Sequence, residues 1–394
     1  MRHPRQLRVL LLYDCIYPDA AGGVEHRNFE LALELGRRGH QVTLAGFAAR
    51  SSTPAPGVEV RSLGPPARLY DPTGRRSRTQ ALRLAMAAAR LDLRPFDLVE
   101  TANIPYLHLA PLALRCRLAG KPLVVNWHAH WGRYWREYIG GPSWPLYAAI
   151  EWLAAQAGTA AFAVSRMTAG RVAAQRRGGA VEVVPNGVPA GRIRGAARAG
   201  DPPGPPLLFA GRLIRERRLH LLVEALAILS AAAGPSSGGA LLAIAGEGPE
   251  RQRLEELARH RGVADRIVFH GTLPSASLWR EMARSRIAVQ PSSQESFGMF
   301  PLEAMAAGLP VLYCTSPDSA LGELVRDGVD GHAVAPSAEA IARRAGELLR
   351  DGAAWDRLHA NALARAAAYD WAAVAERVED LYLALAGRSS AKLV

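Results

Sequence analysis

The sequence lacks the features of a membrane-spanning or disulfide-bonded protein. No apolar run reaches the roughly 20 residues that a spanning helix needs. The segment 1–5 is too short and too badly flanked for a signal peptide, because a strand-like segment follows it at once. Only three cysteines are present, Cys15, Cys116 and Cys314, and they lie far apart, so we expect no disulfide framework and a reducing compartment. These absences predict a cytoplasmic protein.

Lysine is almost absent as well, although the chain is strongly basic. Lys121 and Lys392 are the only lysines, and arginine supplies nearly all of the positive charge behind the net charge of +12. One interpretation is attraction to anionic partners such as nucleotides or phospholipid surfaces. The other is that abundant arginine and alanine reflect a GC-rich bacterial genome. Nucleic acid is not expected as a partner, because the arginines are scattered and no basic motif with interleaved aromatic residues occurs.

Apolar periodicity predicts alternating strands and helices in a chain long enough for two domains. The 394 residues, 49% of them hydrophobic and 21% charged, suit a globular protein with large cores. A strand at 7–12, a helix at 24–38 and a strand at 41–47 form a βαβ opening, which predicts a parallel sheet. Further strands of this half are expected at 97–101, 123–127, 160–164 and 181–184.

A second βαβ series follows a segment at 189–206 that is rich in Gly, Ala, Arg and Pro and that we interpret as a linker. Its strands are expected at 207–210, 241–245, 267–270, 287–290 and 310–313, and its helices at 219–231, 250–261, 277–284 and 299–307. A Ser/Gly-rich patch at 235–239 is interpreted as a surface loop. The sequence therefore predicts an α/β fold of two Rossmann-like, doubly wound domains that face each other across a cleft, where ligands bind in such folds.

The strongest local signal is a segment that begins at Glu295 and ends at Glu303. It is expected to join a strand to a helix, so the amides at 298–300 would be free at the helix N-terminus and able to bind an anion. Glu303 would accept hydrogen bonds from a vicinal diol such as ribose, and Glu295 would do the same for sugar hydroxyls. The alternative is that Glu303 is a first-turn glutamate that only complements the helix dipole.

Two arginines five residues apart, Arg212 and Arg217, follow the strand expected at 207–210. On a strand-to-helix loop they could converge on one diphosphate through charge-assisted hydrogen bonds and stabilise a departing nucleoside diphosphate. The alternative is an ordinary exposed basic loop.

Two further signals lie in the first half of the chain. Gly22 and Gly23 stand at the first strand-to-helix turn, where the backbone could approach a phosphate or sugar closely. They do not form a GxGxxG motif, so a dinucleotide site is not supported. His128 follows the strand at 123–127 and could contact a sugar or an acceptor. The alternatives are a histidine merely hydrogen-bonded at a strand end, and a zinc pair with His130 that lacks a third ligand nearby.

Taken in order along nearly the whole chain, these segments resemble the GT4 family of glycosyltransferases, which has the GT-B fold. The matching motifs are Gly22-Gly23-Val24-Glu25, Gly211-Arg212 through Arg217, Gly246-Glu247-Gly248-Pro249, Glu295-x-Phe297-Gly298 and Glu303-Ala304-Met305-Ala306-Ala307-Gly308. The resemblance implies an acceptor-side domain at 1–190 and a nucleotide-sugar-binding domain at 206–371. It also implies a last helix, at about 372–394, that crosses back onto the first domain.

The resemblance implies a role for each matching residue. Glu303 would bind the ribose, Arg212 and Arg217 the diphosphate, and Glu295 the donor sugar. The backbone of Phe297, Gly298, Met299 and Phe300 would meet sugar and phosphate, and Gly22 and Gly23 would approach the diphosphate from the other domain. His128 would lie near the transferred sugar, so that His128 and Glu295 are the residues assigned to catalysis. The reaction would retain the anomeric configuration and use no cofactor and no divalent metal, in agreement with the absence of an Asp-x-Asp motif.

Several positions depart from the family pattern, among them 315–319, where Thr-Ser-Pro-Asp-Ser stands in place of the usual glycine-rich turn. The family lysine is Arg217 here, and the glycine that follows it is Arg218. The acid that often stands two residues after the family histidine is His130. The longer guanidinium fork of arginine could shift the phosphate geometry, and the contacts with the acceptor stay open.

The resemblance predicts a retaining glycosyltransferase that moves a sugar from a nucleotide diphosphate sugar, UDP- or GDP-linked, to a glycan, lipid-linked or small-molecule acceptor. Surface polysaccharide or glycolipid synthesis would be the setting. The alternatives are a catalytically inactive partner subunit of a glycan assembly complex, and a sugar-nucleotide epimerase. A pyridoxal-phosphate phosphorylase is nearly excluded, because Lys392 in the tail is the only lysine after Lys121.

Aromatic and basic residues are mixed at 133–138, and an aromatic-rich segment lies at 144–153. With the positive net charge, these segments could hold the protein on an anionic membrane surface. The alternative is that 144–156 is an ordinary packed helix.

Overall fold

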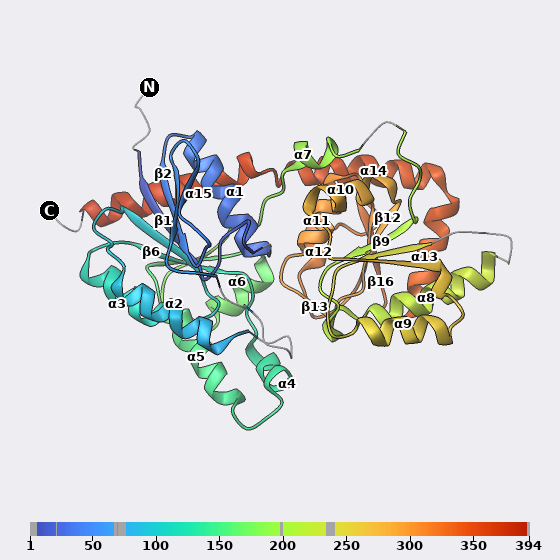
Figure 1. Ribbon diagram of the computed structural model, residues 1–394, viewed down its shortest axis with the longest axis horizontal. Coiled ribbons are helices and arrows are strands. Elements are labelled where there is room, and N and C mark those ends of the chain that lie inside the picture. The colour runs from blue at the N-terminus through green and yellow to red at the C-terminus, as the bar shows by residue number, and fades with distance from the viewer. Residues whose placement is uncertain are drawn as a thin grey trace. The chain divides into compact units, whose positions relative to one another are not determined.

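The computed structural model describes residues 6–20, 22–66, 69, 76–197, 200–233 and 241–391. The chain divides into an N-terminal unit, Met1–Gly187 with Trp371–Val394, and a C-terminal unit, Val188–Asp370. Each unit is an α/β domain built on a mainly parallel sheet (Figure 1). The patch at 235–239 and Lys392 lie outside the described residues. The prediction of two Rossmann-like domains is confirmed.

The sheet of the N-terminal unit has eight strands in the order β3-β4-β2-β1-β5-β6-β7-β8. All neighbours are parallel except β3 and β4, and β1 pairs with β2 from Arg8↔Gln41 and with β5 from Val9↔Leu98. Helical crossovers between parallel strands account for this arrangement. The strands are β1 (Arg8–Leu12), β2 (Gln41–Gly46), β3 (Ser52–Ala55), β4 (Val58–Ser62), β5 (Leu98–Ala102), β6 (Leu123–Trp127), β7 (Ala160–Ala163) and β8 (Val181–Val183).

Two hydrophobic cores lie on opposite faces of this sheet. Alternate residues of β1 divide between them, Val9 and Leu11 in one and Leu10 and Leu12 in the other, as the period of two in a strand requires. Helices α1 (Gly23–Arg37) and α15 (Trp371–Ala391) cover the first face. Helices α2 (Arg78–Arg90), α3 (Leu109–Leu118) and α5 (Trp144–Gln156) cover the second, and α4 (Trp135–Ile139) and α6 (Arg166–Ala173) complete the unit. The last helix thus packs on the N-terminal unit.

The sheet of the C-terminal unit is entirely parallel, in the order β11-β10-β9-β12-β14-β16. The chain starts at β9 in the middle, builds outward on one side and returns to β12 on the other, so a topological switch point lies between β9 and β12. Its strands are β9 (Leu207–Ala210), β10 (Leu242–Ala245), β11 (Ile267–Gly271), β12 (Ile287–Gln290), β14 (Val311–Cys314) and β16 (Gly331–Val334), and a separate parallel pair is formed by β13 (Gln294–Glu295) and β15 (Asp318–Ser319). Its helices are α7 (Ala190–Arg194), α8 (Leu219–Ala233), α9 (Arg251–His260), α10 (Ser275–Arg284), α11 (Met299–Ala306), α12 (Leu321–Leu324), α13 (Ala338–Arg350) and α14 (Gly352–Ala367).

The linker predicted over 189–206 is wrong in its first part. Residues 190–194 form α7, whose Ala190 and Ile193 are buried, and α7 packs against α10 and α11. Three-residue spacing of the buried positions is typical of a helix, but the surrounding Gly, Arg and Pro conceal it in the sequence. This segment therefore belongs to the C-terminal unit.

The two connections between the units run side by side. Val188 forms a parallel bridge with Asp370, and its amide donates to the carbonyl of Tyr369 at 2.8 Å. Gly187 lies against the indole of Trp371, where a Cβ would overlap the ring, so only glycine fits without a shift. The chain therefore leaves and re-enters the N-terminal unit at one place.

Candidate donor site and the N-terminal glycine loop

Arg212 lies on a loop that the neighbouring strand ends hold in place. The amide of Gly211 donates to the carbonyl of Ala245 at 2.9 Å, and the amide of Leu213 donates to the carbonyl of Glu247 at 2.9 Å. A Cβ at Gly246 would overlap the carbonyl of Gly211, which explains the glycine there. Arg212 itself is exposed. The loop therefore presents its guanidinium group from a fixed backbone at the carboxyl end of β9.

Arg217 and Glu295 form a direct ion pair at the switch point. Arg217 ends a short 3-10 helix after β9, and Glu295 lies on β13 after β12. Arg217 Nη1 also donates to Ser292 Oγ at 3.2 Å, and Gln290 Nε2 donates to Glu295 Oε2 at 3.0 Å and to Ser292 Oγ at 2.9 Å. The structure thus brings together two residues to which the resemblance gives separate duties. Gln290, which reasoning from the sequence missed, and Ser292 complete the network.

The residue after this pair has an unusual backbone. Arg218 is left-handed, with φ 49° and ψ 36°, and it directly precedes α8. Residues with a Cβ adopt this region at a cost, whereas glycine adopts it freely. The departure from the family glycine therefore places strain beside Arg217.

The segment 297–300 is fixed by its own side chains. Phe297 packs against Tyr369 with ring centroids 6.1 Å apart, and Phe300 packs against Phe209 at 5.9 Å. Gly298 has φ 102°, and a Cβ there would come within 2.6 Å of Leu321. Both phenylalanines are buried. What this segment offers a ligand is therefore the backbone at the start of α11, with Met299 as its first residue.

Glu303 is the fifth residue of α11, and no acidic residue lies in the first turn. The alternative of a first-turn glutamate is therefore not supported. Burial raises the pKa of Glu303 to about 7, and the side chain of Trp279 opposes this rise. A carboxyl with this pKa is poised between its neutral and ionised forms near neutral pH.

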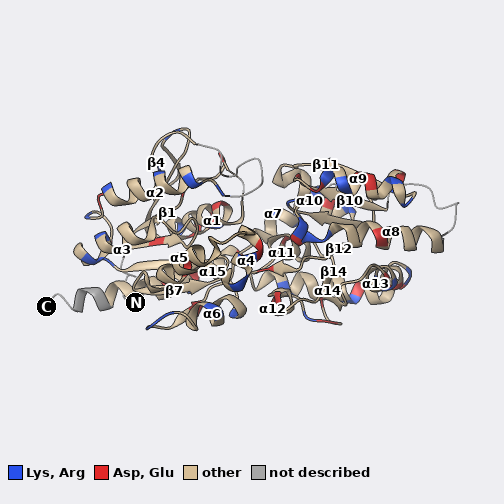
Figure 2. Cartoon of the chain, turned by 90° about the horizontal axis from the view of Figure 1, so that it is seen from below, with Lys and Arg blue, Asp and Glu red and all other residues tan. Residues whose placement is uncertain are grey.

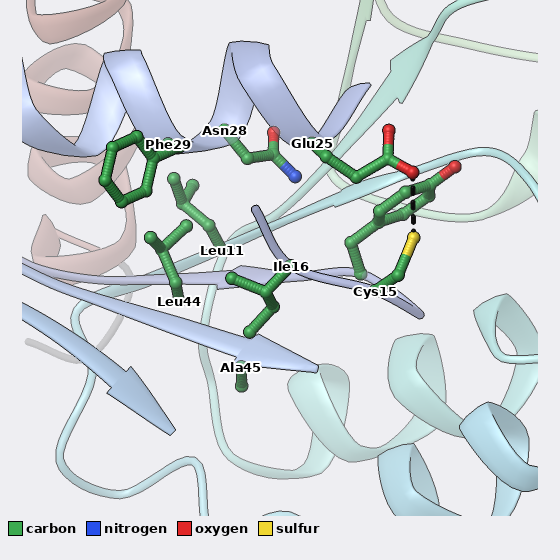
Figure 3. Close-up of a pocket in the computed structure, with 9 residues that line it drawn as sticks. Leu11, Cys15, Ile16, Glu25, Asn28, Phe29, Leu44 and Ala45 are labelled. Carbon is green, nitrogen blue, oxygen red and sulfur yellow. Dashed lines mark hydrogen bonds between the residues drawn. The ribbon is translucent and has the colours of Figure 1, made fainter. Parts of the chain in front are cut away.

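In the N-terminal unit, Gly22 caps α1 and Gly23 begins it. At this end of α1 the Cys15 thiol donates a hydrogen bond to Glu25 Oε1 at 2.9 Å (Figure 3). A Cβ at Gly22 would crowd the same carboxylate. The pocket drawn around them leaves about 10 Å³, room for at most one water molecule. This pocket is therefore no substrate site.

His128 lies directly after β6, where the side chain of Asn103 accepts a hydrogen bond from its amide at 3.2 Å. Within the described part of the chain, its buried Nε2 has no hydrogen-bond partner. Burial, and then the charge of Arg27, lower the pKa of His128 to about 3. The imidazole is therefore neutral at physiological pH and retains a free hydrogen-bonding atom.

A buried network that reasoning from the sequence missed lies beside this histidine. Arg27 on α1 donates to Glu100 Oε1 at 2.6 Å, Asn126 donates to the same oxygen at 3.1 Å, and the Tyr382 hydroxyl donates to Glu100 Oε2 at 2.5 Å. The side chains of Arg27 and Glu100 are both buried, so removal of either one would leave the other as an unpaired charge in the interior. No motif marks these residues, since they come from α1, β5, β6 and α15.

His130 lies over another buried carboxylate. Its Nε2 is 3.7 Å from Glu151, which also accepts hydrogen bonds from the amides of Trp131 and Gly132 at 2.8 Å each. Among the residues that the structure describes, no group of three His, Cys, Asp or Glu could hold a metal ion. Neither ring nitrogen of His130 has a hydrogen-bond partner within the described residues, so Glu151 fixes this loop through the amides of Trp131 and Gly132 and not through His130.

The aromatic residues of the segment 133–138 pack largely on Trp131 and on one another. Trp131 stacks on Trp135 at 5.0 Å, Tyr138 meets Trp131 at 4.4 Å, and Trp135 is buried. The segment 144–156 is helix α5, whose Leu146 and Leu153 are exposed, so membrane contact at this segment stays a prediction. Along the described chain, no helix is both long and apolar enough to cross a membrane.

The two α/β units match solved structures of the GT-B class. Sucrose-phosphate synthase from Thermosynechococcus elongatus superposes with a TM-score of 0.76 at 20% identity, covering 97% of this chain and 99% of that chain. HepE from Anabaena, solved with UDP, gives 0.71 at 17% identity, covering 95% and 99%. At these identities the likeness shows the fold, and the predicted GT-B fold is confirmed.

The sequence comparisons identify the family. Residues 21–192 match the family description "Glycosyltransferase Family 4", and residues 200–365 match "Glycosyl transferases group 1". The 2-deoxystreptamine N-acetyl-D-glucosaminyltransferase of Streptomyces fradiae is 31% identical over 77% of this chain and 80% of its own length. A glycogen synthase of Mycobacterium tuberculosis is 36% identical, but the match spans 52% of this chain and only 48% of that protein. The chain belongs to the GT4 family of glycosyltransferases, as its motifs predict.

We predict that Arg218→Gly raises the free energy of unfolding by about 1 kcal/mol, because glycine removes the cost of a left-handed residue. Arg218→Ala is the matched control, since it also removes the charge but keeps the Cβ. Urea unfolding should rank the glycine variant above both the wild type and the alanine variant. Equal stability of the two variants would contradict a strained backbone.

A second prediction concerns the pH dependence of stability. The pKa of Glu303 is about 7 in the folded chain against an ordinary value of 4.5, so the folded state binds more protons between these values and loses stability as pH rises through this window. Thermal melting from pH 4.5 to 7.5 should show wild type losing stability relative to Glu303→Gln. The exposed Glu339→Gln serves as the control. Parallel curves for wild type and Glu303→Gln would refute the raised pKa.

Proposed function

We propose that this protein is a retaining, metal-independent glycosyltransferase that uses a nucleotide diphosphate sugar. The observation that carries the proposal is the Arg217–Glu295 pair at the switch point of the C-terminal unit, next to the loop that presents Arg212. Gln290 and Ser292 hold Arg217, a cation for a diphosphate, beside Glu295, a carboxylate that can accept hydrogen bonds from sugar hydroxyls. The rest of the proposed donor site extends along the start of α11.

Within the C-terminal unit, Arg212 and Arg217 bind the diphosphate and stabilise the charge that develops on it as the glycosidic bond breaks. Glu295 shares its carboxylate between Arg217 and a donor-sugar hydroxyl. The backbone of residues 297–300 binds sugar and phosphate oxygens through amides at a helix N-terminus. Glu303, in its ionised form, accepts hydrogen bonds from the ribose hydroxyls.

Within the N-terminal unit, His128 acts on the transferred sugar. Its neutral ring and its unpartnered Nε2 support a role as a hydrogen-bonding group and not as a cation. The backbone at Gly22 and Gly23 approaches the donor diphosphate, since neither residue has a side chain to obstruct it. The side chains of Phe297 and Phe300 do not contact the donor. They pack on other aromatic rings and so hold the backbone that binds it.

The arginines supply the positive charge that a divalent metal supplies in other transferases, which supports a reaction without one. Membership of the GT4 family supports retention of the anomeric configuration. The departing phosphate assists removal of the acceptor proton, so Glu295 and Glu303 serve binding and are not a glycosidase pair.

A UDP-sugar is the first donor to test, with GDP-sugars next, because HepE of the same fold binds UDP and UDP-glucose. The acceptor is a glycan, a lipid-linked saccharide or a small molecule, and the Streptomyces fradiae relative is named for a small-molecule acceptor. Free cysteines at Cys15, Cys116 and Cys314 support a cytoplasmic setting, since all three are buried thiols. Surface polysaccharide or glycolipid synthesis is the proposed role.

We expect a nucleotide sugar to raise the melting temperature, because a ligand that binds only the folded chain stabilises it. A screen of UDP- and GDP-sugars by thermal melting measures this shift and names the donor. Glu303→Ala should weaken the binding of that donor at pH 8 by about 10-fold or more, the loss expected when a charged hydrogen-bond partner is removed.

Glu339→Ala removes an exposed glutamate from the first turn of α13 and is the matched control. It should leave the donor affinity unchanged. Donor affinity equal to wild type in Glu303→Ala would refute the ribose role. A screen in which no nucleotide sugar shifts the melting temperature would refute the donor class.

A further inference from the structure

Exposed large apolar side chains are concentrated on one layer of helices. Of the nine in the described part of the chain, seven lie on or directly beside α2, α3 and α5 of the N-terminal unit, and the other two lie in the C-terminal unit. The seven are Leu82, Met86, Leu107, Leu114, Leu118, Leu146 and Leu153, with Leu118 at 79% exposure. We call this set the leucine face.

The exposed residues follow helical spacing. Leu82 and Met86 lie four residues apart on α2, Leu114 and Leu118 four apart on α3, and Leu146 and Leu153 seven apart on α5. Spacings of four and seven place residues on one side of a helix. Each helix therefore carries an apolar stripe that points to solvent.

The opposite sides of the same helices already fill the core. Leu84, Leu112 and Ala155 are fully buried in the core on the second face of the sheet. The leucine face is therefore not needed to hold the helices on the sheet.

These helices form one continuous layer. Helix α2 precedes β5, α3 joins β5 to β6, and α5 joins β6 to β7, so right-handed crossovers place them side by side over neighbouring strands (Figure 1). Helices α2 and α3 are also in contact.

The charge on this layer is mainly of one sign. Helices α2 and α3 carry five arginines and no acidic residue, and Lys121 follows α3 (Figure 2). The one acid of α5, Glu151, is fully buried. Arg83 lies over the Phe47 ring and Arg115 donates to a backbone carbonyl, whereas Arg90 and Arg117 are exposed. Asp92, which follows α2 and pairs with Arg94, is an exposed acid beside Arg115, so the leucine face is apolar with a mainly basic surround.

We propose that the leucine face docks the N-terminal unit on an anionic lipid surface. Leucine side chains enter the apolar edge of the bilayer, and the surrounding arginines meet phosphate headgroups. A second copy of the chain is disfavoured as the occupant, because two such faces would bring mainly positive charges together. This surface shares α5 with the aromatic-rich segment 144–153, and its binding does not depend on the proposed donor chemistry.

Flotation of the full chain with vesicles tests the proposal. We expect binding to vesicles that contain phosphatidylglycerol, weak binding to pure phosphatidylcholine, and loss of binding at high salt. Leu114→Gln with Leu118→Gln should lower the partition coefficient by about 10-fold or more. Arg90→Gln with Arg117→Gln should lower it about five-fold for each arginine removed.

Matched controls come from the C-terminal unit. Ile228→Gln removes an exposed apolar residue and Arg259→Gln removes an exposed arginine, and neither should change vesicle binding. Melting temperatures and thermal shifts with the donor should be unchanged in all four variants, which separates failure of docking from failure of the donor site. Absence of binding to anionic vesicles, or equal losses in variants and controls, would overturn the proposal. So would self-association of the wild type that the leucine variants abolish.

Discussion

The Arg217–Glu295 ion pair is the interaction on which the proposed donor site depends. It joins the chain after β9 to the chain after β12, the two strands that flank the switch point. Both side chains are partly buried, so the pair is screened less than a surface salt bridge. Gln290 and Ser292 occupy further hydrogen-bonding positions, which limits the orientations that either group can adopt. A ligand that binds here meets a preorganised arrangement of charge.

Close backbone packing supports this pair. Glycine at Gly246 lets the loops after β9 and β10 touch, and Gly298 lets the start of α11 lie against Leu321. Burial also sets the charge states around the two units, because it raises the pKa of Glu303 and lowers that of His128. Tight packing therefore fixes the backbone of the loops and also, through burial, the protonation states of Glu303 and His128.

Short apolar runs in the sequence predicted several strands, whereas some helices and the tertiary contacts of the site were not predicted. The strands at 123–127, 207–210 and 287–290 have the predicted bounds, because each is a short apolar run between turn residues. Helix α2 was not predicted, because Leu82, Leu84 and Met86 are the only large apolar residues in its Ala- and Arg-rich sequence. In the candidate site, sequence motifs located Arg217 and Glu295. They did not predict the ion pair between them, because that contact depends on the tertiary structure. The Arg27–Glu100–Tyr382 network was invisible, since its members lie far apart in the sequence.

Titration calorimetry of the full chain with UDP, GDP and ADP measures whether Arg217 and Glu295 belong to a nucleotide site. We expect one of these nucleotides to bind, and we expect Arg217→Ala to weaken its binding by about 10-fold or more through loss of a charge-assisted contact, whereas Arg259→Ala should leave its affinity unchanged. If none of the three nucleotides binds, or if Arg217→Ala binds with the wild-type affinity, Arg217 is not part of a nucleotide site.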